Sequence, residues 1–170
     1  MMTQIVAIAT IKRAHPVNGR PEPEQSLELC TFVPFRLNRL ATGVSQYLAA
    51  IYQDRFGLDI PQWRVMATVG GRACTAQYIA ASTRMHKTRV SRAIAELEAR
   101  DLIERASNEQ DRREREVRLT KAGRRVYAEL VPLALERQRS LLACLAPGQL
   151  PGFLEGLYAL EKFLHLEDQP

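Results

Sequence analysis

The feature that most constrains this sequence is a change of hydrophobic period within residues 75–120. Apolar residues first recur at the i, i+4, i+7 spacing of one helix face, at Val90, Ile94 and Leu97. The later part alternates instead, because Val117 and Leu119 are apolar and their neighbours are polar, which is typical of a half-buried strand. The stretch therefore predicts a short helix over residues 75–81, a tight turn, a longer helix and a two-stranded hairpin.

The predicted longer helix opens with a basic surface. Its cations fall between residues 84 and 92 with no acid among them, and they are Arg84, Lys87, Arg89 and Arg92. The polar residues that accompany them are His86, Thr88 and Ser91. Such side chains donate hydrogen bonds to phosphates, or to base edges from a helix in the major groove. A solvated basic helix end is the alternative, but a short helix, a turn and a longer basic helix favour a DNA-binding helix-turn-helix.

The tip of the predicted hairpin, residues 109–113, is too charged for an ordinary tight turn. Asp111 can hold Arg112 or Arg113 extended through a charge-assisted hydrogen bond. A guanidinium held in this way can enter the narrow, electronegative minor groove of DNA. The alternative is a local surface ion pair, which contributes at most about 1 kcal/mol.

Together these residues resemble the winged helix-turn-helix of the MarR family of bacterial regulators. The matching motifs are V-S-R at 90–92, L-E-x-R-x-L-I at 97–103, D-R-R at 111–113 and V-x-L-T-x-x-G-R at 117–124. The resemblance extends over roughly residues 32–166, because the flanking helices also fit the family's pattern. His86 is a departure, since many members have an Asp that would cap the helix, and His is a poorer cap. His86 could contact a phosphate instead.

Long helices are predicted on both sides of this region. One begins near Phe32 and ends at Gly57, and another opens at Pro61 and is broken by a Gly-Gly pair. On the C-terminal side, Pro132 is expected to bend a long helix, and Pro147 separates a last one. That last helix carries a stripe of leucines, at Leu150, Leu154, Leu157, Leu160 and Leu164, which requires something to bury it.

The resemblance implies a division of the chain and a dimer. We expect a flexible arm over 1–29, a first dimerisation helix over 30–58, the winged domain over 59–120 and C-terminal dimerisation helices over 121–168. In the MarR family the first and last helices of two subunits interleave. The two DNA-reading helices then lie about one DNA turn apart, which predicts a near-palindromic operator.

The resemblance also implies a small effector that releases DNA. The candidates for binding it are Arg36, Arg39, Tyr47, Trp63 and Arg64. Two guanidiniums at i, i+3 on one helix can hold a carboxylate or phosphate, and Trp63 with Tyr47 can line an aromatic slot. The set suggests an aromatic acid or its coenzyme A thioester. The alternative for each residue alone is an ordinary core or ion-pair role.

A redox-sensing alternative rests on Cys30, because some relatives sense peroxides through a Cys near the start of the first helix, where a thiol pKa falls. Cys74 and Cys144 are expected to be buried, inert thiols. The sequence has no C-x-x-C, and its three His do not cluster, so neither a disulfide framework nor a zinc site is predicted. No metal or cofactor is expected, and a reduced cytoplasm is the expected location.

Composition excludes several other classes. The 170 residues are 46% apolar and carry a net charge of +5, which suits a packed core and a polyanionic partner. There is no G-x-S-x-G, P-loop or H-E-x-x-H, so an enzyme is not predicted. No apolar run approaches the roughly 20 residues that span a bilayer, so no membrane partner is expected. A dimeric interaction module that does not bind DNA stays open as an alternative.

Overall fold

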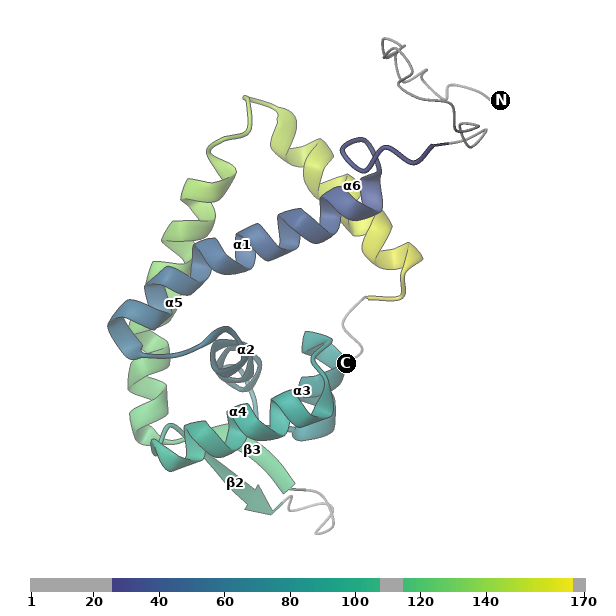
Figure 1. The fold of residues 1–170 in the computed structure, drawn as a ribbon. Coiled ribbons are helices and arrows are strands. Elements are labelled where there is room, and N and C mark those ends of the chain that lie inside the picture. Colours follow the sequence, from purple (N-terminus) through teal and green to yellow (C-terminus); the bar gives the residue numbers. More distant parts are fainter. Residues whose placement is uncertain (1–25, 108–114, 167–170) are drawn as a thin grey trace, which may run out of the picture. The chain divides into compact units, whose positions relative to one another are not determined.

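The computed structural model describes residues 26–107 and 115–166, and it divides into two compact units, residues 1–38 and 39–170. The elements in order are α1 (Val33–Phe56), α2 (Ile60–Val69), β1 (Cys74–Thr75), α3 (Ala76–Thr83), α4 (Lys87–Ala99), β2 (Ile103–Ser107), β3 (Arg115–Leu119), α5 (Lys121–Leu142) and α6 (Gln149–Phe163). The predicted fold class is confirmed: the chain is mainly helical with a small antiparallel sheet, and Figure 1 shows α2, α3 and α4 gathered beside the hairpin of β2 and β3.

Local signals place the junction between α1 and α2. Gly57 ends α1 in the left-handed region at φ 58°, which costs glycine little because it has no Cβ. The Asp59 side chain then accepts a hydrogen bond from the backbone N–H of Gln62 at 2.8 Å. The Gln62 side chain in turn accepts one from the Asp59 backbone at 3.0 Å. This reciprocal pair is a capping box, and together with Pro61 in the first turn it starts α2 one residue before Pro61.

The helix-turn-helix is confirmed, and its caps differ from those expected. The hydroxyl of Thr75 accepts from the backbone N–H of Tyr78 at 3.1 Å and caps α3. Arg84 ends α3 in the left-handed region, so it lies in the turn and not on the basic face of α4. His86 is the N-cap of α4, because its Nδ1 accepts from the backbone N–H of Thr88 at 3.3 Å. The imidazole thus takes the place expected for a short carboxylate.

The sheet has three strands in the order β1-β3-β2, whereas the sequence predicted two. The two-residue strand β1 pairs antiparallel with β3, with Cys74 opposite Val117 and Thr75 opposite Glu116. The predicted hairpin is the pairing of β2 with β3, in which Ile103 lies opposite Leu119. A two-residue strand is too short to show an alternation, which is why the sequence pattern missed β1.

The core lies between the helices of the winged domain and its sheet. Its largest fully buried side chains include Leu58, Met66, Ile79, Ile94, Leu97, Ile103 and Leu130. At its edge, the hydroxyl of Thr120 donates to the carbonyl of Asp101 at 2.6 Å. A Cβ built on Gly123 would stand 1.8 Å from the carbonyl oxygen of Leu102. Only glycine therefore lets the start of α5 approach the start of β2 so closely.

The C-terminal helices differ in how well they are covered. Helix α5 continues through Pro132 to Leu142 and buries Leu130 and Gly123. Helix α6 buries no residue at all. Cys74 is buried as predicted, but Cys144 is exposed, so the prediction of a buried thiol there is wrong. Cys144 follows the end of α5, where no described element covers it.

Candidate nucleic-acid interface

The two faces of α4 have opposite chemistry. One face packs into the core through Val90, Ala93, Ile94 and Leu97. The opposite face is exposed, and it carries the residues that the sequence predicted to contact DNA: Lys87, Thr88, Arg89, Ser91 and Arg92. The first turn contains no acid, so the cations add to the positive end of the helix dipole. This surface is built to meet an anion.

Arg84 and His86 lie in the turn that precedes α4, and both are exposed. The guanidinium of Arg84 donates to the carbonyl of His165 at 3.2 Å. His86 keeps its Nδ1 on the backbone of α4, which leaves Nε2 as the ring atom able to donate outward. Arg84 and His86 therefore lie beside the α4 surface, and the side chain of each forms a hydrogen bond within the chain.

The base of the wing is described, but its tip is not. Asp111, Arg112 and Arg113 lie outside the described residues, so the predicted minor-groove contact is not tested by the structure. Two ion pairs flank the described part of the hairpin. Arg118 donates to Glu104 at 2.9 Å across the two strands, and Arg105 pairs with Glu98 of α4 at 3.2 Å. The second pair joins the wing to the same helix that carries the basic surface.

The residues predicted to bind an effector lie on α1 and α2. Trp63 stacks on Tyr52 with ring centroids 5.7 Å apart. Tyr47 instead lies beneath the guanidinium of Arg137, 4.6 Å from the ring centroid. Arg64 donates to the hydroxyl of Ser45 at 3.2 Å. Arg36 and Arg39 are exposed on α1.

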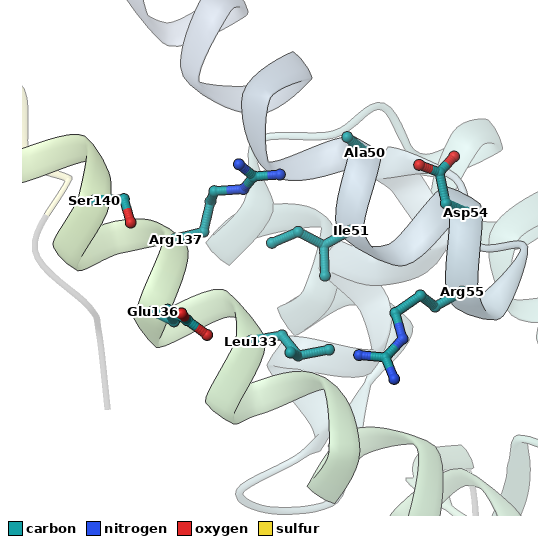
Figure 2. A pocket seen from close by; sticks show the side chains of 8 residues that line it. All are labelled: Ala50, Ile51, Asp54, Arg55, Leu133, Glu136, Arg137 and Ser140. Atoms are coloured by element: carbon teal, nitrogen blue, oxygen red, sulfur yellow. The ribbon is translucent and has the colours of Figure 1, made fainter.

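A cavity of about 370 Å³ lies between α1 and α5. Figure 2 shows Ile51 and Leu133 facing each other across it, with charged groups at its edges. Its full lining is Ala50, Ile51, Asp54, Arg55, Leu133, Glu136, Arg137 and Ser140. None of the predicted effector residues lines it, although Arg137 contacts Tyr47. The sequence missed Arg55 and Arg137 because their helices come together only in the folded chain.

Two other kinds of site are absent from the described residues. No helix in the described ranges is long and apolar enough to cross a membrane. Across residues 26–107 and 115–166, no group of three or more His, Cys, Asp or Glu side chains is placed to hold a metal ion.

The fold defines a winged helix-turn-helix protein, and comparisons with known proteins show which family it resembles. A model described as "MarR family" matches residues 56–114, which contain α2, β1, α3, α4 and β2. No curated protein matches the chain. Residues 56–114 are thus similar to the MarR family, and solved structures described as MarR-family regulators share the fold.

Solved structures share the fold over most of the chain. A MarR/EmrR family regulator from Acinetobacter sp. ADP1 is 23% identical, with a TM-score of 0.73 over 82% of this chain and 99% of that one. CouR from Rhodococcus jostii RHA1, bound to p-coumaroyl-CoA, is 19% identical, with a TM-score of 0.68 over 79% and 95%. Bordetella bronchiseptica BpsR, whose DNA binding is regulated by 6-hydroxynicotinic acid, is 23% identical, with a TM-score of 0.69 over 81% and 98%.

Proposed function

We propose that this chain is a cytoplasmic, dimeric repressor that binds a near-palindromic operator and releases it when a small effector binds. The proposal rests on the exposed, acid-free start of α4, whose opposite face is buried in the core. A helix fixed in this way presents its cations as a rigid unit to the major groove. Arg112 and Arg113 of the wing are proposed to add minor-groove contacts, with Arg84 and His86 at the border of the surface.

The proposed dimer accounts for apolar surface that a single chain leaves uncovered. Helix α6 and the residues after it expose a series of large apolar side chains: Leu150, Phe153, Leu154, Leu157, Tyr158, Leu160, Phe163, Leu164 and Leu166. The described part of the N-terminal unit exposes another set: Leu27, Leu29, Phe32, Val33 and Leu37. Contiguous apolar surface of this kind marks an interface in soluble proteins. A second copy of the chain is the proposed cover for both sets.

The proposed effector is an aromatic carboxylate or its coenzyme A thioester. Two structural relatives support the proposal by analogy, because CouR was solved bound to p-coumaroyl-CoA and the DNA binding of BpsR is regulated by 6-hydroxynicotinic acid. The cavity between α1 and α5 offers Ile51 and Leu133 for an aromatic body and Arg55 and Arg137 for an anionic group. Asp54 and Glu136 also line it, so the anionic group is expected beside the two arginines and away from these carboxylates.

A redox-controlled version of the same repressor is the second candidate. Cys30 is exposed in the N-terminal unit, so a peroxide could reach its thiol. This version predicts release of DNA by peroxide and loss of that response in Cys30→Ser. The small-molecule version predicts a response that Cys30→Ser leaves intact.

The deciding experiment is fluorescence anisotropy with DNA from just upstream of the protein's own gene, and random duplex as the control. We expect tighter binding to the upstream DNA, a steep loss of random-duplex binding with salt, and release by one aromatic acid or thioester. Arg113→Ala should weaken binding about tenfold with an unchanged melting temperature, because the role proposed for Arg113 is a minor-groove contact. A protein that binds no duplex even at low salt would instead be the interaction module that reads no DNA.

A further inference from the structure

Glu96 stands between the DNA-facing side of α4 and the buried start of α2. Its Oε1 accepts a hydrogen bond from the Nε of Arg92 at 2.8 Å. Its Oε2 accepts another from the Nε2 of Gln62 at 2.9 Å, across 34 residues of sequence. One carboxylate therefore links an exposed arginine on the proposed interface to a glutamine that is only 8% exposed.

The orientation of Gln62 is set by the capping box of α2. Its Oε1 already accepts from the backbone of Asp59 at 3.0 Å, and its own backbone N–H donates to the Asp59 side chain at 2.8 Å. Because the amide oxygen is held there, the amide nitrogen must point towards Glu96. The anchor of Glu96 is therefore fixed by the same hydrogen bonds that begin α2, and not by a mobile surface side chain.

The carboxylate is held in its charged form by these two donors. Hydrogen bonds from Arg92 and then from Gln62 lower the pKa of Glu96, and the bond to Glu96 raises the pKa of Arg92. Two donors on two separate oxygens also leave the carboxyl plane little freedom to rotate. Arg92 thus receives its bond from a partner that is both ionised at neutral pH and fixed in direction.

The part of Arg92 that remains available is the end of its guanidinium. The side chain is 82% exposed, and among the described residues only its Nε is hydrogen-bonded, which leaves both Nη atoms to donate outward. Two parallel donors at the end of an arginine match the O6 and N7 acceptors of guanine. Arg89, one turn earlier, has no such carboxylate partner among the described residues. A side chain without a fixed orientation is suited to contact phosphates, which need only a positive charge.

We propose that Glu96, anchored by Gln62, is a positioning residue that aims Arg92 at a guanine in each half-site. The inference deepens the proposed function and rests on it. A contact to phosphate needs only a positive charge, whereas a bidentate contact to guanine needs a fixed guanidinium plane. Glu96 therefore contributes to sequence discrimination, while its own negative charge lowers affinity for DNA in general.

The test compares Glu96→Ala with Glu98→Ala in the full-length protein. Both variants remove one acid from α4, and Glu98 forms a similar ion pair, with Arg105. Wild-type protein first selects a preferred sequence from a randomised duplex pool. Each variant is then titrated with that duplex and with versions in which single base pairs are changed. Melting temperatures confirm that each variant is folded.

Both variants should bind random duplex more tightly than wild type, because each gains one unit of positive charge. Only Glu96→Ala should lose discrimination, by about tenfold at one G·C pair of each half-site. Arg92→Lys should lose the same discrimination. The double variant that combines Arg92→Lys with Glu96→Ala should lose no more discrimination than Arg92→Lys alone. Full discrimination in Glu96→Ala, or an equal loss in Glu98→Ala, overturns the inference.

Failure of the proposed function has a different signature. If the wild-type protein selects no preferred sequence from the pool, the chain is not a sequence-specific DNA binder, and the role of Glu96 falls with that proposal. If the wild type selects a sequence and Glu96→Ala reads it equally well, the regulator stands and only the positioning role is lost. Gln62→Glu is a further test of the positioning role. It keeps an acceptor for the capping box and places a like charge against Glu96.

Discussion

Helices α4 and α6 are both amphipathic, but within a single chain only α4 buries its apolar face. Helix α4 buries Val90, Ala93, Ile94 and Leu97 in the core and exposes cations on the other side. Helix α6 has no buried residue, although leucines recur along it. The difference shows that amphipathic spacing identifies a face to be buried and says nothing about whether the cover comes from the same chain.

The same leucine-to-alanine substitution in both helices should have different effects on stability. Leu97→Ala should lower the free energy of unfolding by about 2–5 kcal/mol at every protein concentration, because the side chain is fully buried in one chain. Leu157→Ala should cost little in dilute protein and more as concentration rises, because its cover is the proposed second copy. Urea denaturation over a range of concentrations measures both. An equal, concentration-independent loss would show that α6 packs within its own chain.

A charged substitution tests the proposed partner of α6 directly. Leu157→Asp should weaken the dimer by about 2 kcal/mol or more, since it buries an unpaired carboxylate at the centre of an apolar face. Operator affinity should fall with the dimer, and the melting of the winged domain should not change. Sedimentation and anisotropy follow the two effects. The exposed position Glu155→Asp serves as a control with no change of charge. A Leu157→Asp variant that remains dimeric would contradict the proposed interface.

Substitution of two glycines compares a buried backbone position, Gly123 on α5, with an exposed one, Gly156 on α6. Gly123→Ala should cost about 1–3 kcal/mol of unfolding free energy, because the new Cβ meets the rigid carbonyl of Leu102. Gly156→Ala on α6 meets nothing within 4 Å in the single chain and should gain about 0.5–1 kcal/mol of helix propensity. Thermal unfolding measures the pair. Loss of the dimer in Gly156→Ala would reveal a close backbone approach by the second copy.

The smallest expected effect concerns the cap of α4. His86→Asp should raise the free energy of unfolding by about 0.5–1 kcal/mol, because a carboxylate is a stronger N-cap and favours the positive end of the helix dipole. It should also weaken binding to random duplex, because it adds an anion beside the basic surface. His86→Ala is the control, and it should be less stable than wild type. If that control is as stable as wild type, the hydrogen bond from Thr88 to His86 contributes nothing.

The sequence predicted most of the winged domain because the signals there are local. The apolar spacing of α4, the glycine after α1 and the Pro61 turn each act within a few residues, and the structure confirms them. The basic surface was also visible in the sequence, because it is the complement of the buried stripe on the same helix. The cap at His86 was missed because an imidazole seldom takes that role.

The candidate effector site shows the opposite behaviour. The sequence grouped Trp63 with Tyr47 as two aromatic residues that could line one slot, whereas the fold stacks Trp63 on Tyr52 and places Tyr47 against Arg137. The cavity is lined half from α1 and half from α5, and no periodicity within one helix reports which residues of another will face it. Exposure of Cys144 was missed for the same reason.

The sequence by itself determined where the helices of the winged domain run and which face of α4 is charged, because caps, turns and period act over distances of a few residues. Tertiary structure alone decided the third strand, the cavity between α1 and α5, and the link from Gln62 through Glu96 to Arg92. These depend on which elements pack together, and a hydrogen bond across 34 residues leaves no repeat in the sequence to reveal it.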